Sequence, residues 1–203
     1  MKLYYTRGSC SLTCRIVINE IGLPCEYESV DLKSKQTEHG GDFTKINLKG
    51  AVPTLVLDNG DILTENAVIQ QYLADEAHAT ELLPKTGNIK RYHVLEWLNY
   101  IATDFHKGIG VLFNYALPQE IKDEVFKPII SHKLKSMDSH LENKKFIYDE
   151  HFTLPDAYFF VMLTWVLNFK FPMTDWPNLK RYFDELKQRP SIAKSLKEER
   201  LTF

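Results

Sequence analysis

The 203-residue sequence is poor in cysteine. Its three cysteines are Cys10, Cys14 and Cys25, and an odd, clustered set of this kind does not form a disulfide framework, so we expect a reducing, cytoplasmic environment. Three residues separate Cys10 from Cys14, instead of the two of a dithiol redox motif, and no two histidines are spaced to bind a metal from one helix face. We therefore expect no metal site.

The sequence also lacks long apolar runs and an excess of charge of one sign. Its longest apolar run, from Ala157 to Leu167, is far shorter than the ~20 residues of a membrane helix, and no apolar signal-peptide segment follows Met1. The 25 basic and 27 acidic side chains give a net charge of -2, which creates no field for nucleic acid or for an anionic membrane. We expect a protein that binds small molecules and neither nucleic acid nor membranes.

Residues 1–81 alternate strand-like and helix-like segments. The pair Asn59-Gly60 between two β-prone runs is a strong hairpin signal, and Thr64 is placed to cap the helix that follows it. Gly22 suits the end of the first helix. The expected strands are 2–5, 26–30, 54–57 and 62–63, and the expected helices are 11–21, a short one at 42–46, and one that begins at 65. This order predicts a βαβ unit followed by a ββα unit.

Beyond a polar linker at 82–87, residues 88–203 show only helical patterns. Thr153 and Asp156 have the spacing of a capping box, with Pro155 in the first turn, and the helix after them is apolar on nearly every face. We expect that helix to be central. The other expected helices cover roughly 93–105, 121–141, where Pro128 kinks the helix or marks its start, 179–186 and 191–199. The sequence thus predicts an α/β domain followed by an all-α domain.

Cys10 and Ser11 lie between the first strand and the first helix. A thiol at a helix N-terminus experiences the positive end of the peptide dipoles, which favours the thiolate. The alternative is a buried structural cysteine followed by a capping serine. Cys14 shares an apolar stripe with Val17 and Ile21, so we expect it to pack in the core.

Two further segments could bind a ligand through backbone groups. A cis peptide bond at Val52-Pro53 would turn the Val52 backbone toward a ligand, whereas a trans turn proline is the alternative. At Thr64-Glu65-Asn66, helix N-terminal amides could bind a carboxylate while Glu65 holds an ammonium group. Together these groups suit an amino-acid zwitterion, although ordinary helix capping explains the second segment as well.

The helix at 93–105 carries a polar set on an otherwise apolar pattern. Asn99, Thr103 and His106 are spaced four and three residues apart, which predicts one shared face, and Asp104 and Lys107 lie beside them. A solvated helix face is the alternative to a binding role.

Four segments together resemble the bacterial beta-class glutathione S-transferases. They are Met1 through Ser11, the turn 47–53, the run 63–73 and the segment 153–158, which occur in the order and at the spacing of that family. The resemblance implies a thioredoxin-like N-terminal domain and an all-helical C-terminal domain, hence the glutathione transferase fold, in a homodimer. It also implies glutathione as co-substrate, with no prosthetic group.

The resemblance assigns most of the tripeptide to the first domain. It implies that Val52, ahead of cis Pro53, pairs with the cysteinyl backbone of glutathione. Glu65 and Asn66 would receive the γ-glutamyl end, and Lys35 would lie near the glycine carboxylate. Asn66 is larger than the glycine or serine that is usual in the family at this position.

The same resemblance places Cys10 beside the glutathione sulfur, with which it could form a mixed disulfide. Ser11 would assist catalysis, and His106 and Lys107 would approach the thiol from the helical domain. Contributions across the dimer interface would come from Asn99, Thr103 and Asp104.

The leading hypothesis is a detoxification enzyme that conjugates the glutathione thiol to small hydrophobic electrophiles. One alternative is a glutathione-dependent thiol-disulfide oxidoreductase that uses Cys10. Another is a glutathione-binding stress or interaction protein without catalytic activity.

Overall fold

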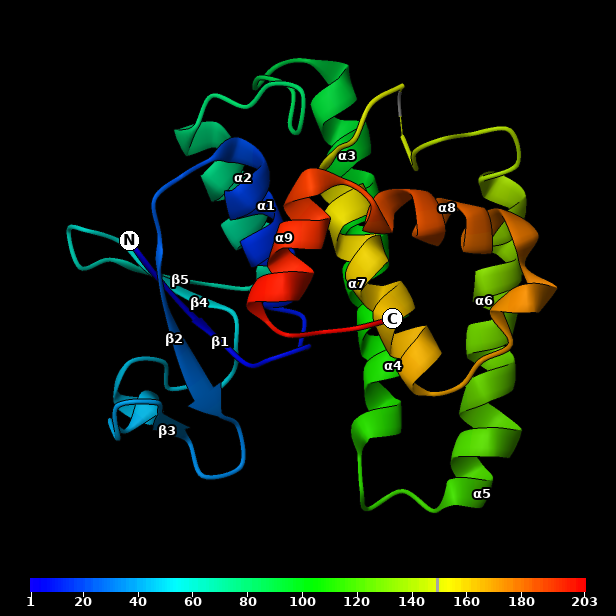
Figure 1. The fold of residues 1–203 in the computed structure, drawn as a ribbon, viewed down its shortest axis with the longest axis horizontal. Coiled ribbons are helices and arrows are strands. Elements are labelled where there is room, and N and C mark those ends of the chain that lie inside the picture. Colours follow the sequence, from blue (N-terminus) through cyan, green and yellow to red (C-terminus); the bar gives the residue numbers. More distant parts are fainter. Residues whose placement is uncertain (149) are drawn as a thin grey trace. The chain divides into compact units, whose positions relative to one another are not determined.

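The computed structural model describes residues 1–148 and 150–203, and these form two compact units (Figure 1). The first unit comprises Met1–Thr80 together with Pro190–Thr202, and the second comprises Glu81–Arg189 together with Phe203.

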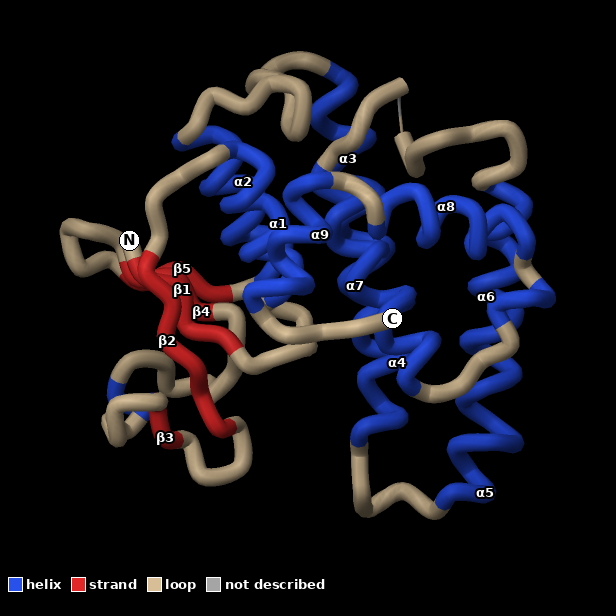
Figure 2. Tube along the Cα trace, in the orientation of Figure 1, coloured by secondary structure: helices blue, strands red, loops and turns tan. Residues whose placement is uncertain are grey.

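The first unit is built on a five-stranded sheet, drawn in red in Figure 2. Its strands are β1 Lys2–Tyr5, β2 Glu26–Asp31, β3 Gln36–Thr37, β4 Thr54–Val56 and β5 Ile62–Thr64, in the order β3-β2-β1-β4-β5. β1 pairs in parallel with β2 and antiparallel with β4, and β4 and β5 form the predicted hairpin. The βαβ and ββα units are confirmed. β3, which is not among the expected strands, extends the sheet by pairing with β2.

Three helices belong to this unit, namely α1 Leu12–Ile21, α2 Asn66–Glu76 and α9 Pro190–Glu198. A 3₁₀ turn at Phe43–Lys45 matches the expected short helix. α1 ends at Gly22, which has φ 72° and donates to the Ile18 carbonyl at 2.9 Å, as predicted. The expected capping by Thr64 is wrong, because Thr64 is the last residue of β5 and Glu65 occupies the cap position.

α9 differs from the expected division into 1–81 and 88–203, because it clusters with the first unit. Arg15 of α1 pairs through Nη1 with Glu198 at 3.3 Å and through Nε with Glu199 at 3.0 Å. Asn19 of α1 also donates to Ser195 at 2.9 Å. These polar contacts of α1 with α9 and with the residue after it place the last helix in the first unit.

The regular elements in the described part of the second unit are all helical. The α-helices are α3 Ile89–Tyr100, α4 Lys107–Gly110, α5 Gln119–Ile121, α6 Lys127–His140, α7 Leu154–Asn168 and α8 Pro177–Lys187. The predicted capping box of Thr153 and Asp156 is present, and α7 is buried along nearly its whole length, which confirms its central position. In this core Phe160 of α7 stacks on Phe183 of α8, with 4.9 Å between the ring centroids.

Two wide π-helical turns interrupt helices that the sequence predicts to be continuous. They are Ile101–His106, between α3 and α4, and Lys122–Phe126, between α5 and α6. The second turn comes just before Pro128, which has no N–H to donate to the preceding turn. A π turn rotates the residues after it about the helix axis, so side-chain positions inferred from regular α-helical spacing shift.

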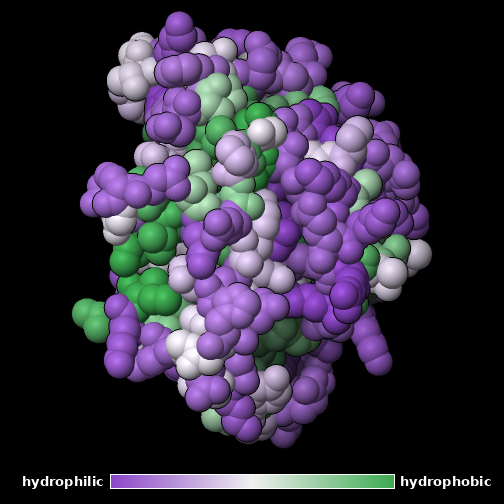
Figure 3. Space-filling view, turned by 60° about the vertical axis from the view of Figure 1, so that its left-hand side comes forward, coloured by the Kyte–Doolittle hydropathy of each residue, from purple (hydrophilic) through white to green (hydrophobic). Residues whose placement is uncertain are grey.

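The surface seen in Figure 3 is mostly hydrophilic, with green apolar side chains between the purple ones. The most exposed large apolar residues are Leu48 and Tyr115, at 94% and 99%. Single exposed apolar side chains are common on protein surfaces, so exposure alone assigns these two no role. Among the helices of the described residues, none combines the length and the apolar character needed to cross a membrane.

Candidate functional site

Three chain segments converge at one edge of the sheet in the first unit. This edge is formed by the ends of β1 and β5 and by the start of β4. In the strand register Tyr4 pairs with Thr54, and Thr54 pairs with Thr64. Because β4 runs antiparallel to both neighbours, the residues that follow β1, precede β4 and follow β5 lie at the same edge. The sheet thereby brings together the segment 6–11, the Val52-Pro53 bond and the start of α2.

Cys10 lies at the centre of this edge. It is 7% exposed, and its Sγ donates to the Val52 carbonyl at 3.3 Å. The Val52–Pro53 peptide is cis, as the family resemblance implied. The Val52 amide has no hydrogen-bond partner among the described residues. A backbone donor beside a thiol is thus left for a ligand.

Ser11 occupies the cap position of α1, but its side chain makes no capping hydrogen bond to the helix. The residue is 0% exposed, and its Oγ accepts from the Thr6 amide at 3.2 Å and lies 2.7 Å from the Ser9 hydroxyl. Ser11 therefore closes the turn between β1 and α1. These bonds show that Ser11 helps to hold residues 6–11, the Cys10 loop, and its catalytic role stays a prediction.

Asn66 begins α2, and its side chain is turned into the protein. The residue is 6% exposed; its Nδ2 donates to the Cys10 carbonyl at 2.7 Å, and its Oδ1 accepts from Gln70 at 2.8 Å. The backbone amides of Asn66 and Ala67 have no partner among the described residues, as is usual in a first helical turn. The larger side chain thus fastens α2 to the Cys10 loop and leaves the helix N-terminus open to an anion.

Glu65 precedes this helix N-terminus, with a φ of 71°. Its carboxylate accepts from Lys49 Nζ at 2.7 Å, and the same Nζ donates to the Thr64 hydroxyl at 3.0 Å. Sequence reasoning missed Lys49, whose only signal was a basic side chain in the turn before Val52-Pro53. The ion pair is solvent-exposed at both ends, so a ligand can replace one partner at small cost.

Lys35 is the last expected residue of this unit that the structure brings to the edge. Its Nζ donates to the Gly50 carbonyl at 2.8 Å, two residues before Val52. The structure therefore assembles Cys10, Lys35, Val52, Pro53, Glu65 and Asn66 at one place in the first unit.

Cys14 packs in the core, as predicted, and its Sγ donates to Asn66 Oδ1 at 3.7 Å. It is fully buried on α1, and burial raises the pKa of its thiol well above the usual value. A protonated, buried thiol is a packing group, and the reactive candidate is Cys10.

The remaining expected residues belong to the second unit. Asn99, Thr103 and Lys107 are exposed, and Thr103 Oγ1 donates to the Asn99 carbonyl at 3.0 Å. Asp104 pairs with Lys133 Nζ at 2.6 Å, and this bond holds the pKa of the Asp104 carboxyl below its usual value. Asn99, Thr103 and Lys107 are thus the exposed members of this polar set, and their binding roles stay predictions.

His106 does not share the exposed face of Asn99 and Thr103, because the π turn ends at this residue. Its Nδ1 lies 2.5 Å from the Tyr158 hydroxyl of α7, and its ring lies edge-on to Trp165, with 5.2 Å between centroids. The predicted shared face is therefore wrong for His106. The ring is instead held in a fixed orientation by α7.

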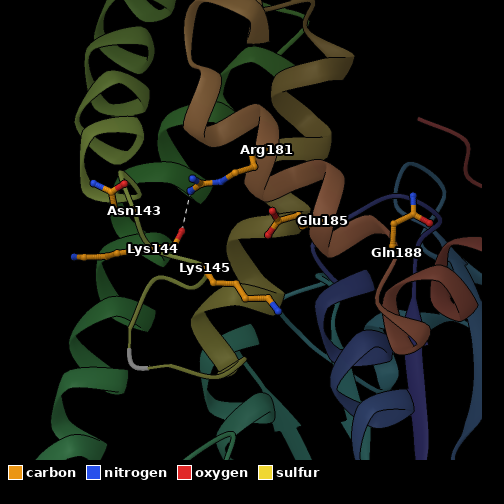
Figure 4. A pocket seen from close by; sticks show the side chains of 6 residues that line it. All are labelled: Asn143, Lys144, Lys145, Arg181, Glu185 and Gln188. Carbon is orange, nitrogen blue, oxygen red and sulfur yellow. Dashed lines mark hydrogen bonds between the residues drawn. The ribbon is translucent and has the colours of Figure 1, made fainter.

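Figure 4 shows a cavity of ≈ 610 Å³ that lies entirely within the second unit. Its lining residues are Asn143, Lys144, Lys145, Arg181, Glu185 and Gln188. Arg181 donates to the carbonyl oxygens of Leu141 and Lys144, at 2.7 and 2.8 Å, and so caps the end of α6. None of the expected site residues lines this cavity. In the described chain there is also no group of three or more metal-ligating side chains suited to an ion.

Comparison with known proteins identifies the family of this chain. Residues 8–76 match the N-terminal domain, and residues 103–199 the C-terminal domain, of glutathione S-transferases. Glutathione S-transferase GstA of Escherichia coli O157:H7 is 38% identical over 99% of this chain and 100% of its own.

Two solved structures are similar over the full length of both chains. A sphingomonad glutathione S-transferase complexed with glutathione has a TM-score of 0.94 and 36% identity, and covers 100% of each chain. A beta-class glutathione S-transferase of Sphingomonas chungbukensis has a TM-score of 0.95 and 35% identity, with the same coverage. The chain belongs to the glutathione S-transferase family, as a member of its bacterial beta class.

Proposed function

We propose that the protein binds glutathione at the sheet edge of the first unit and transfers its sulfur to small hydrophobic electrophiles. The observation that carries the proposal is the convergence of a thiol, an unpartnered backbone amide and an open helix N-terminus, at Cys10, Val52 and Asn66. The sphingomonad relative complexed with glutathione supports the same ligand.

Each charged group of the tripeptide binds a group of opposite charge or dipole, and its cysteinyl backbone binds a backbone segment. The γ-glutamyl carboxylate binds at the N-terminus of α2, where the peptide dipoles favour an anion, and the α-ammonium group binds Glu65. The cysteinyl backbone pairs with Val52, which orients the sulfur toward Cys10. Lys35, which already lies near this turn, neutralises the glycine carboxylate.

Conjugation requires the glutathione thiolate, because the thiolate and not the thiol is the nucleophile. We assign His106 and Lys107 as the donors that stabilise it, on the basis of family membership. Contacts across a homodimer interface are assigned on the same basis to Asn99, Thr103 and Asp104. We also propose that the protein acts as a cytoplasmic homodimer.

The proposed conjugation is tested with glutathione and 1-chloro-2,4-dinitrobenzene, an activated aryl halide, by following product absorbance. We expect a protein-dependent rate that saturates with glutathione. The Glu65→Gln variant should need a higher glutathione concentration, because its neutral amide attracts the ammonium group less strongly. The absence of any rate above the uncatalysed background, with several electrophiles, would contradict the proposal.

A second activity is favoured by the position of Cys10 at the start of α1. The Cys10 thiolate attacks the glutathione sulfur of a mixed disulfide, so that Cys10 and glutathione become joined and the other thiolate departs. A second glutathione thiolate then attacks the joined glutathione sulfur. Glutathione disulfide leaves, and the Cys10 thiolate is restored.

Lys49 provides a prediction about affinity. Lys49→Met is expected to lower the KM for glutathione by up to about threefold, because Lys49 Nζ and the ligand ammonium compete for Glu65 and an exposed ion pair is weak. Glutaryl-cysteinylglycine, which lacks the ammonium group, is the matched ligand and should show no such gain. Equal gains for both ligands would mean that Lys49 acts on the site as a whole.

A further inference from the structure

The C-terminal segment of the first unit contacts the loop that carries Cys10. Glu199 follows directly after α9, and its Oε2 accepts from the Gly8 amide at 2.8 Å. Beside this contact, Arg7 donates to the Arg200 carbonyl, and the Leu201 side chain lies 3.5 Å from the position that a Cβ on Gly8 would take. Residues 199–201 therefore lie against the loop two to three residues before the thiol.

Glu199 is held rigidly in place. Its side chain is 0% exposed, and its Oε1 pairs with Arg15 Nε at 3.0 Å. The Arg15 guanidinium lies over the rings of Tyr5 and Tyr27, at 4.5 and 3.7 Å from their centroids. A buried carboxylate with a buried guanidinium partner has few alternative positions, since either charge alone would be costly to leave unpaired. The acceptor presented to Gly8 is thus fixed by the surrounding structure.

The Cys10 loop depends on this acceptor. Gly8 has a φ of 67°, a conformation that few other residues adopt readily, and its amide is directed to Glu199. The far end of the loop is closed by the bonds between Ser11 and Thr6. The loop is short, so a displaced Gly8 shifts Cys10 relative to the Val52 carbonyl.

We propose that Glu199 is a positioning residue of the glutathione site, which holds the Cys10 loop in its binding geometry through the Gly8 amide. The inference rests on the proposed function, because it concerns the same site. Glu199 itself contacts no substrate. If the Gly8 bond favours the binding geometry, then by linkage glutathione must stabilise that bond to the same extent.

Glu199→Gln is the first test, with Glu198→Gln as its matched control. Glu198 also pairs with Arg15 but, among the described residues, has no hydrogen bond to the loop. We expect Glu199→Gln to raise the KM for glutathione about tenfold, as befits a lost charge-assisted hydrogen bond, with a smaller change in kcat. Alkylation of Cys10 by iodoacetamide, followed by mass spectrometry, should become about fivefold faster as the loop loosens. Glu198→Gln should leave both values within about twofold.

Glu199→Asp separates the hydrogen bond from the ion pair. Aspartate keeps the negative charge for Arg15 but is one methylene too short to reach both Arg15 and Gly8. We expect the same rise in KM as in Glu199→Gln. A normal KM in the aspartate variant, or a loss of thermal stability with unchanged kinetics in either variant, would overturn the proposal and leave Glu199 with a structural role only.

Hydrogen exchange can be measured on the unmodified protein, so this test does not depend on whether a variant folds. We expect the Gly8 amide to be protected in nuclear magnetic resonance spectra and glutathione to increase its protection. An unprotected Gly8 amide, or protection unaffected by bound glutathione, would overturn the proposal. Hydrogen exchange and Cys10 alkylation, both measured without glutathione, do not depend on turnover. If the unmodified protein showed no conjugating activity, that result would count against the proposed function and not against the role of Glu199.

Discussion

Replacing Asp156 with alanine is expected to lower the free energy of unfolding by about 3–5 kcal/mol, because it leaves several buried donors without an acceptor. Asp156 is fully buried at the start of α7. Its Oδ1 accepts from the Ile147 amide at 2.9 Å and from the Tyr182 hydroxyl at 2.8 Å, and its Oδ2 accepts from the Thr153 amide at 2.9 Å. One carboxylate thus joins α7 to α8 and to the segment before α7.

Asp156→Asn is expected to be nearly as destabilising, although it conserves shape. Both oxygens of Asp156 face donors, since the Thr153 hydroxyl also donates to Oδ2, at 2.9 Å. An amide would place its own NH₂ against one of these sets of donors. Urea denaturation followed by circular dichroism measures the free-energy change.

Asp184→Asn on α8 is the matched control. Asp184 pairs with Lys180 at 2.5 Å, but both side chains are about half-exposed. An exposed pair of this kind contributes less than about 1 kcal/mol. If the free energy of unfolding of the Asp156 variants were as high as that of Asp184→Asn, the role assigned to the buried carboxylate would be refuted.

Cys10→Ala is expected to separate the two proposed activities. Reduction of a glutathione mixed disulfide should fall by about a hundredfold or more, because no sulfur remains to accept glutathione. Conjugation should fall by less than about tenfold, since its nucleophile is the sulfur of glutathione itself. Both rates are measured on the same preparation, with a mixed disulfide and with an aryl halide as substrates.

Cys25→Ser is the control for this experiment, because Cys25 is partly exposed and lies outside the Cys10 loop. It should leave both rates unchanged. Disulfide reduction that persists in Cys10→Ala would mean that another group carries the redox step. A parallel collapse of conjugation would show that Cys10 also activates the glutathione thiol.

Features with local physical causes could be predicted from the sequence. The hairpin at Asn59-Gly60 follows from backbone conformations that these two residues adopt at low cost, and the capping box follows from two side chains within one turn. The proximity of Cys10 and Val52 was implied by the family resemblance and not by the local pattern, because it depends on the order of the strands in the sheet.

Features that depend on distant partners could not be predicted in this way. The amphipathic pattern of α9 indicates a helix but not that Arg15 is its partner. The π turn that directs His106 to Tyr158 breaks the 3.6-residue period on which the expected polar face relied. The partner of Glu65 is likewise a lysine from another turn of the chain.

The Arg15–Glu199 pair also bears on the order of events during synthesis. The sheet of the first unit is encoded by the first 80 residues, whereas its last helix is translated only after residue 189. At about 5–20 residues per second, a nascent chain waits several seconds or more between these two points. During that interval Arg15 and the Gly8 amide lack Glu199, so the thiol loop reaches its final form only after residue 199 has been translated.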